Sequence, residues 1–419
     1  MNRTGTTFLH NLLAQDDRMV APLFYEMSTP LAASGTAANT RLTLTPEERA
    51  AQLKAVEDQQ EVLCCMQGSD ELTQLHHSSA AAPEEDFVIF EQTFRSWLYE
   101  ALADIPSYHQ DLVQKGMMEA YAYHKQFLQL LQHQHRLDRV YNEVEGVYNE
   151  VDGAEQARRW VLKYPFHLMN LPELFATYPD AKVIQTHRPL EQALPSWFKL
   201  VLSLRQVFSG AKHCKPHIGC TQTGFMANML ERCLSFRQDN AAISAASWID
   251  VKSADLFAQP MDVVSLIYER LGMDLTEEAK EAMETWIRQD AKRRMKRMKE
   301  IEELQPQPEE GQQWKEWGVK EAEVTEIKAN AAALWGIAQQ HGTCVRTQSY
   351  IIKRCKQLLQ ALVAMALALL LAATGLFPGV LIMIKVPGIT GLIGGLLGIA
   401  NGIAAACVVM WCMHVRGTK

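Results

Sequence analysis

The stretch MNRTGTTFLHNLLAQDD, residues 1–17, sets the architecture of this chain. A glycine-centred turn runs directly into apolar positions 8, 9, 12 and 13, a spacing typical of a helix. The start of a helix offers free backbone N–H groups and the positive end of the helix dipole to an anion. Gly5 lets a ligand approach the backbone closely, and Thr6 and Thr7 add hydroxyl donors. The stretch therefore indicates a phosphate-binding turn, with an ordinary helix start capped by threonine as the alternative.

Length, charge and cysteine content narrow the classes of protein to consider. A chain of 419 residues has room for one large domain or two ordinary ones, with a buried site. Its formal net charge of −7 argues against a broad nucleic-acid-binding surface, which needs an excess of lysine and arginine. The nine cysteines form no CxxC pair and no Cys/His spacing suited to zinc. We therefore expect neither a nucleic-acid partner nor a metal.

Two apolar segments near the C-terminus, residues 358–384 and 386–413, carry no charged residue. Each is long enough to cross a bilayer of about 30 Å. The KVPG sequence at 385–388 predicts a tight turn between them, and glycines four residues apart favour close helix packing. We predict a transmembrane hairpin. The GLFPG interruption at 375–379 leaves a kinked helix, or one span with a re-entrant piece, as the alternative.

Basic residues flank both ends of this pair, which places the rest of the chain on the cytosolic side of the membrane. They are Lys353, Arg354, Lys356, Arg416 and Lys419. The predicted organisation is an α/β domain over 1–345, a basic juxtamembrane segment over 346–357, two transmembrane helices over 358–413 and a tail over 414–419. Such a protein is expected to be a multi-pass protein of an endomembrane.

The part before these segments alternates between helical and strand-like patterns. Helical periodicity covers 46–63, 85–102, 107–136, 189–208, 222–245, 261–272 and 276–303, and short β-prone runs lie at 160–162 and 182–186. This alternation predicts an α/β sheet.

A second polar cluster lies in LKYPFHLMNLPELFATYPDAKVIQTHRPLEQALPSWFKL, residues 162–200. Arg188 follows the predicted strand at 182–186, and open α/β folds bind ligands at that end of a strand. Ser196 lies about two helical turns later, so its hydroxyl returns to the side of the arginine. Together the two side chains can hold one phosphate, although each alone also fits a plain structural role.

Three segments of the chain are RTGTT, KYPFH and YPDAK, and the last of them leads into His-Arg with a serine eight residues after the arginine. This set of motifs resembles that of sulfotransferases that use 3′-phosphoadenosine 5′-phosphosulfate (PAPS). The likeness spans about residues 3–335. It implies an α/β fold with a P-loop-like central parallel sheet flanked by helices. Relatives have a strand directly before the opening turn, whereas only Met1 and Asn2 precede it here. We expect that upstream residues are missing or that the sheet is completed in another way.

The resemblance also implies the residues of a donor site and of a catalytic site. Its donor-binding positions are Arg3, Thr4, Gly5, Thr6, Thr7, Arg188 and Ser196. The turn would hold the 5′-phosphosulfate, and the arginine and serine would hold the 3′-phosphate. Glu26 is the candidate base for the acceptor hydroxyl, and Lys163 would stabilise the leaving oxygen. His167 is a second candidate base, with a structural histidine packed under the loop as the alternative.

Two functions follow from this resemblance. The first is a membrane-anchored sulfotransferase that moves a sulfuryl group from PAPS to a hydroxyl of a lipid, a carbohydrate or a small molecule, without a metal. The second is a catalytically impaired relative that binds or scaffolds at a membrane. The stretch APEEDFVIFEQTF, residues 82–94, is similar to one that shapes the acceptor pocket in relatives.

Overall fold

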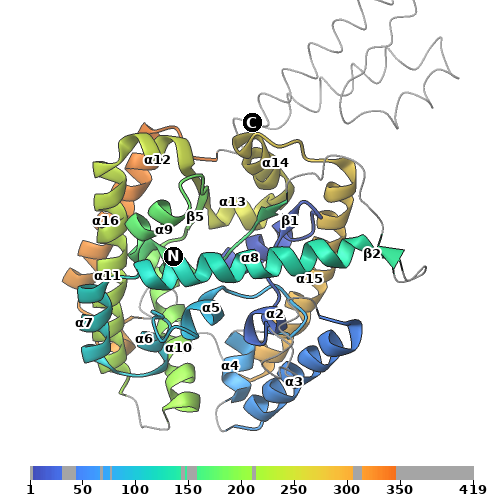
Figure 1. Ribbon diagram of the computed structural model, residues 1–419. Helices are drawn as coiled ribbons and strands as arrows, with labels where there is room; N and C mark the ends of the chain where they lie inside the picture. The colour runs from blue at the N-terminus through green and yellow to red at the C-terminus, as the bar shows by residue number, and fades with distance from the viewer. Residues whose placement is uncertain are drawn as a thin grey trace, which may run out of the picture. The chain divides into compact units, whose positions relative to one another are not determined.

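The computed structural model describes residues 3–30, 44–66, 69–75, 78–142, 147–148, 158–209, 214–304 and 314–345. These residues belong to the first of two compact units, Met1–Thr347, shown in Figure 1. Within these ranges no helix has the length and the apolar character that a bilayer crossing requires. The predicted juxtamembrane segment, hairpin and tail, residues 346–419, lie outside the described residues.

The first part of the unit is almost entirely helical. Its helices are α1 (Thr6–Leu13), α2 (Phe24–Ser28), α3 (Pro46–Cys64), α4 (Ser69–Leu75), α5 (Phe87–Glu91), α6 (Tyr99–Leu102), α7 (Pro106–Lys115) and α8 (Met118–Val140). The prediction for 46–63 is confirmed by α3. The pattern predicted over 107–136 divides into α7 and α8 because Gly116 adopts a left-handed φ of 67° that ends α7. The pattern over 85–102 likewise divides into α5 and α6.

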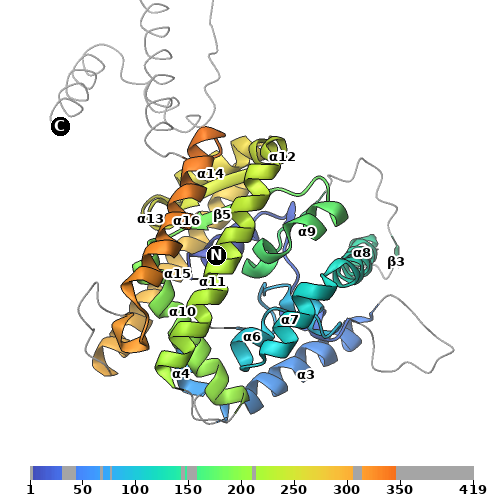
Figure 2. The ribbon, with the colours of Figure 1, turned by 90° about the vertical axis from the view of Figure 1, so that its left-hand side faces the viewer.

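The second part contains longer helices and two short 3₁₀ turns. They are η1 (Pro165–Met169), α9 (Leu171–Thr177), α10 (Leu190–Phe208), α11 (Lys215–Asp239), α12 (Ala241–Ser247), α13 (Ser253–Ala258), α14 (Pro260–Leu271), α15 (Glu277–Leu304), η2 (Lys315–Trp317) and α16 (Glu321–Gln340). Three predicted helices match α10, α14 and α15 to within one residue at each end. Helices α10, α11 and α16 pack side by side (Figure 2).

Small parallel pairs of strands, rather than one sheet, lie among these helices. β1 (Met19–Val20) pairs with β4 (Arg159–Trp160), and β5 (Val183–His187) pairs with β6 (Trp248–Lys252). A third pair, β2 (Tyr141–Asn142) and β3 (Val147–Tyr148), is antiparallel. The predicted α/β class with parallel strands is confirmed, but the prediction of a single central sheet is wrong for the described residues. Among the described residues, the two parallel pairs share no strand.

Side chains of the opening segment link the two parallel pairs instead. Thr4 is fully buried, and its hydroxyl meets the hydroxyl of Thr186 on β5. His10 lies on α1, one turn after Thr6. Its ring lies 2.9 Å from the carbonyl oxygen of Val161, the residue directly after β4. Residues 3–13 therefore hold both strand pairs at fixed positions.

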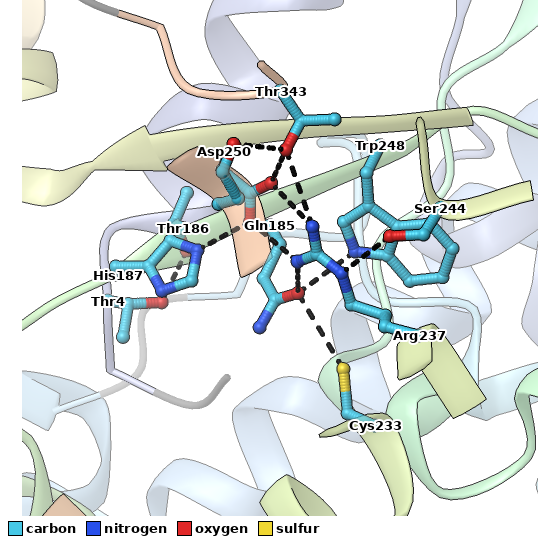
Figure 3. Close-up of polar contacts among 11 residues, drawn as sticks. Thr4, Gln185, Thr186, His187, Cys233, Arg237, Ser244, Trp248, Asp250 and Thr343 are labelled. Atoms are coloured by element: carbon cyan, nitrogen blue, oxygen red, sulfur yellow. Dashed lines mark hydrogen bonds and ion pairs between the residues drawn. The ribbon is translucent and has the colours of Figure 1, made fainter. Parts of the chain in front are cut away.

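A buried ion pair between Arg237 and Asp250 stabilises the pair of strands β5 and β6 (Figure 3). The Arg237 guanidinium donates two hydrogen bonds, of 2.9 and 3.0 Å, to the carboxylate of Asp250, and neither side chain is exposed. His187 lies 2.7 Å from the same carboxylate, and the Thr343 hydroxyl donates to it. Burial alone would raise the pKa of Asp250, but these donors outweigh it and hold that pKa below its usual range. The network fixes β5, the strand directly before Arg188.

We predict that Asp250→Ala lowers the free energy of unfolding by about 3–5 kcal/mol, because it leaves the Arg237 charge buried without its partner. Urea denaturation measures the change. The exposed pair of Asp104 and His217 serves as the control, and Asp104→Asn should cost about 0–1 kcal/mol. A loss below about 1 kcal/mol for Asp250→Ala would contradict this account of the network.

Candidate active site

The opening turn has an unusual backbone that aims the start of α1. Arg3 adopts a positive φ of 62°, and Gly5, the N-cap residue of α1, has a φ of 92°. A Cβ atom at Gly5 would lie 3.1 Å from the Phe257 ring, so a larger residue there is both strained and crowded. Backbone N–H groups at the start of a helix point away from its own carbonyl groups, so those of Thr6 and Thr7 can face an anion.

The turn is in direct contact with the second predicted donor-binding segment. The Arg188 guanidinium, at the end of β5, donates a 3.0 Å hydrogen bond to the carbonyl oxygen of Arg3. The Arg3 guanidinium in turn donates a 3.0 Å hydrogen bond to the Ser196 hydroxyl on α10. The structure therefore brings the turn at residues 3–7 together with Arg188 and Ser196. About 180 residues separate the turn from these two residues in the sequence.

A cavity of about 380 Å³ opens beside this contact. It is lined by Arg3, Gly5, Thr6, Thr7, Phe8, Asn11, Glu85, Phe87, Leu98, Pro165, Phe166, Arg188, Trp197, Leu200, Leu204, Phe257, Trp286 and Asp290. Five of these are among the predicted donor-binding residues. Thr4 and Ser196 do not line the cavity. They hold the turn in place, Thr4 through its contact with Thr186 and Ser196 through its hydrogen bond from Arg3.

The lining of the cavity is of two kinds. One part carries the opening turn and Arg188 together with the rings of Phe257 and Trp286, which flank Phe8 at centroid distances of 5.2 and 5.3 Å. The other part is apolar. Its residues come from α10, the start of η1 and the region around α5 and α6, and they are Phe87, Leu98, Pro165, Phe166, Trp197, Leu200 and Leu204.

Lys163 is paired with a carboxylate that lines this cavity. Its side chain is 5% exposed, and its ammonium group contacts the carboxylate of Glu85, which lines the cavity and is 18% exposed. Lys163 itself is not among the lining residues. The predicted cation therefore contacts a carboxylate that lines the cavity but does not line the cavity itself.

His167 belongs to a buried network and does not line the cavity. Its Nε2 lies 3.1 Å from the carboxylate of Asp86 and its Nδ1 lies 2.7 Å from the Tyr121 hydroxyl. The same carboxylate lies 2.9 Å from the ring of His124. Burial would raise the pKa of Asp86, but the His167 and His124 rings hold it far below its usual range. This geometry favours the structural alternative for His167.

The structure does not bring Glu26 to the cavity. One carboxylate oxygen of Glu26 accepts the backbone N–H of Leu23 at 2.9 Å, which completes a capping interaction at the start of α2. The other oxygen lies 2.7 Å from the His135 ring on α8. Both oxygens of the predicted base are thus engaged in packing contacts.

In the described part of the chain, no group of three or more His, Cys, Asp or Glu side chains is arranged to hold a metal ion. The cations at the cavity are the guanidinium groups of Arg3 and Arg188, with the Lys163 ammonium behind Glu85. Helix dipole, backbone amides and these cations are the available partners for a bound anion.

Comparisons with known proteins identify the family and the fold. A family model described as the sulfotransferase family matches residues 1–277, about two thirds of the chain, and the chain therefore belongs to that family. Its structure is similar to the crystal structure of sulfotransferase STF1 from Mycobacterium tuberculosis H37Rv, with 28% identity over 79% of this chain and 74% of that chain and a TM-score of 0.55. No curated protein gives a significant match.

A second solved structure shares the fold. Sulfotransferase STF9 from Mycobacterium avium covers 78% of this chain and 73% of its own, with 23% identity and a TM-score of 0.57. The expectation of a sulfotransferase is confirmed by the family match, and the fold is that of a helix-rich α/β sulfotransferase.

Several cavity residues were not singled out from the sequence. Glu85 was not named as a site residue, although it lies in APEEDFVIFEQTF, the stretch whose resemblance implies a part of the acceptor pocket. Phe257 and Trp286 carry no signal of their own, because they reach the cavity only when α13 and α15 pack against Phe8.

His10 couples the opening helix to pH. Burial, reinforced by the nearby charge of Lys163, lowers the pKa of His10 to about 4, so the ring is neutral near pH 7. The unfolded chain protonates this histidine near 6.5, whereas the folded chain resists protonation down to about 4. Acidification across this window therefore favours the unfolded state.

We predict that the free energy of unfolding falls as pH decreases from about 6.5 to about 4, with His10 contributing on the order of 3 kcal/mol. His10→Gln keeps a donor for the Val161 carbonyl but does not titrate, so it should flatten this slope. His124, whose pKa is also lowered by burial, retains part of the slope. Urea unfolding at several pH values provides the measurement, and an unchanged slope in His10→Gln would refute the coupling.

Proposed function

We propose that this protein transfers the sulfuryl group of PAPS to a hydroxyl group on an apolar acceptor. The observation that carries the proposal is the meeting of the opening turn and Arg188 at one cavity. PAPS carries an anionic group at each end of its ribose, and two separate cationic positions suit such a molecule. The sulfotransferase family also implies this donor.

The residues present fit the donor in charge and in shape. The amides at the start of α1, with the Thr6 and Thr7 hydroxyls, suit the 5′-phosphosulfate. Arg188 suits the 3′-phosphate, the group that distinguishes this nucleotide from ATP. The ring faces of Phe257 and Trp286 suit a nucleobase. When bound, the donor supplies the sulfuryl group, and the protein supplies position and charge.

The acceptor class follows from the other part of the cavity. Seven apolar side chains line it, three of them on α10, and such a lining favours a hydrocarbon ligand over a sugar. We therefore place a lipid or another apolar alcohol ahead of a carbohydrate as the acceptor. A carbohydrate would need many more hydrogen-bonding groups on that wall than the lining residues provide.

We also propose that residues 358–413 anchor the enzyme in a membrane with its folded unit on the cytosolic side. The support is the sequence of two uncharged segments flanked by basic residues. An apolar acceptor resident in that membrane would then be concentrated near the cavity.

Membrane fractionation tests the anchor. The full chain should sediment with membranes, resist extraction by high salt and by alkaline carbonate, and dissolve only in detergent, because hydrocarbon burial rather than charge holds it. Release by salt alone would contradict the anchor and leave a peripheral association.

Binding of adenosine 3′,5′-bisphosphate, the product of the donor, tests the nucleotide site. We predict that Arg188→Ala weakens this binding by about 10-fold to 150-fold, the loss of one charge-assisted contact of about 1.5–3 kcal/mol. Isothermal titration calorimetry gives the dissociation constants. Arg288→Ala is the matched control, since Arg288 is 65% exposed on α15 and pairs only with a neighbouring turn of its own helix in the described contacts.

Two outcomes separate the candidate functions. Equal affinities for wild type and Arg188→Ala would remove the nucleotide site from this cavity. Tight nucleotide binding without transfer from PAPS to any member of a panel of lipid, alcohol and carbohydrate acceptors would favour the impaired, scaffolding relative.

A further inference from the structure

The cavity contains two carboxylates, and only one of them lies where the acceptor wall begins. Glu85 lines the cavity together with Phe87, two residues further along the chain. Its partner Lys163 precedes Pro165 and Phe166, which also line the apolar part. Asp290 lies on α15 one turn after Trp286, whose ring flanks Phe8 in the part that carries the opening turn. Glu85 is thus the carboxylate at the junction of the two parts.

The position of Glu85 is fixed by its neighbour in the chain. The backbone N–H of Asp86 donates a 3.2 Å hydrogen bond to the carbonyl oxygen of Lys163. The Asp86 side chain is fully buried and is held by the His124 and His167 rings. Asp86 therefore ties the segment of Glu85 to the segment of Lys163, while its own carboxylate is turned into the protein interior, away from the cavity.

We propose that Glu85 is the catalytic base that takes the proton from the acceptor hydroxyl, an assignment that rests on the proposed function. In the transfer step a new bond forms between the acceptor oxygen and sulfur. The bond between sulfur and the bridging oxygen of the donor breaks, and its electron pair stays with the phosphate of adenosine 3′,5′-bisphosphate. The acceptor proton passes to the Glu85 carboxylate, which later releases it to water.

Lys163 has a matching role in this arrangement. In the structure its ammonium group is paired with Glu85, which lines the cavity, whereas Lys163 does not. When Glu85 takes up the acceptor proton, its negative charge disappears and the Lys163 charge is no longer compensated. That positive charge is then available to the leaving phosphate at the moment when negative charge develops there. The two side chains act as one unit.

The remaining candidates for the base are occupied elsewhere. Both oxygens of Glu26 contact Leu23 and His135, and both ring nitrogens of His167 contact Asp86 and Tyr121. Neither residue lines the cavity.

The variant Glu85→Gln keeps the shape of the side chain and removes its proton-accepting charge. With PAPS and a long-chain aliphatic alcohol, we expect kcat to fall by about 100-fold or more, the usual contribution of a general base. With a phenol acidic enough to be ionised at the assay pH, we expect a fall of less than about 10-fold, because that acceptor needs no base. A role limited to structure would lower both rates by the same factor.

A second readout does not depend on turnover. Calorimetric titration with adenosine 3′,5′-bisphosphate should show binding to Glu85→Gln that is equal to or tighter than binding to wild type, because an anion is removed from an anion-binding cavity. Glu316→Gln is the control for both readouts. It also removes the acid of a lysine–glutamate pair that joins distant segments, but Glu316 is 43% exposed, away from the cavity.

The outcomes are distinguishable. If wild type neither binds the nucleotide nor transfers sulfuryl groups, the proposed function fails. If wild type is active and Glu85→Gln retains its rate with the aliphatic alcohol, Glu85 is not the base. Equal loss with both acceptors, or weakened nucleotide binding, would assign Glu85 a structural role, whereas partial recovery in Glu85→Asp with the same acceptor preference would support the assignment.

Discussion

Contacts from two sides fix the turn before the first helix, and this turn sets the direction in which that helix begins beside the cavity. The buried hydroxyl of Thr4 meets that of Thr186 on β5, and the Arg188 guanidinium donates to the carbonyl oxygen of Arg3. Gly5 then turns the chain into α1 with a backbone that other residues rarely adopt. A phosphate site built from backbone amides depends on such fixing, since the amides contribute direction as well as charge. The enzyme obtains its site from the contact between the turn and the end of β5.

Carboxylates with similar intrinsic chemistry acquire different roles from their surroundings in this protein. Asp250 and Asp86 are buried among cationic and histidine donors, and each fixes a segment that leads to the cavity. Glu26 joins α2 to α8. Glu85 alone faces both a lysine and the apolar lining of the cavity. Environment separates structural acids from one suited to proton transfer, as in other enzymes that use paired carboxylates.

Local patterns in the sequence were sufficient for the long helices and for the two segments that the structure brings together at the cavity. The turn at residues 3–7 and Arg188 could be recognised because their chemistry lies in short contiguous motifs at the ends of regular elements. The sequence could not predict that the parallel strands form two separate pairs. This outcome depends on how far strands of two to five residues extend once they are packed. The prediction of Glu26 as the base relied on its distance along the chain from the turn. Its contacts with Leu23 and His135 arise only from tertiary packing.

In the proposed complex, the opening turn and Arg188 hold the 5′- and 3′-phosphates of one nucleotide in a single cavity. The most direct test is a crystal structure of the full chain with adenosine 3′,5′-bisphosphate. We predict that the 5′-phosphate accepts hydrogen bonds from the backbone N–H groups of Thr6 and Thr7 and that the 3′-phosphate contacts the Arg188 guanidinium. A nucleotide bound outside this cavity, or with neither phosphate at these groups, would contradict the account.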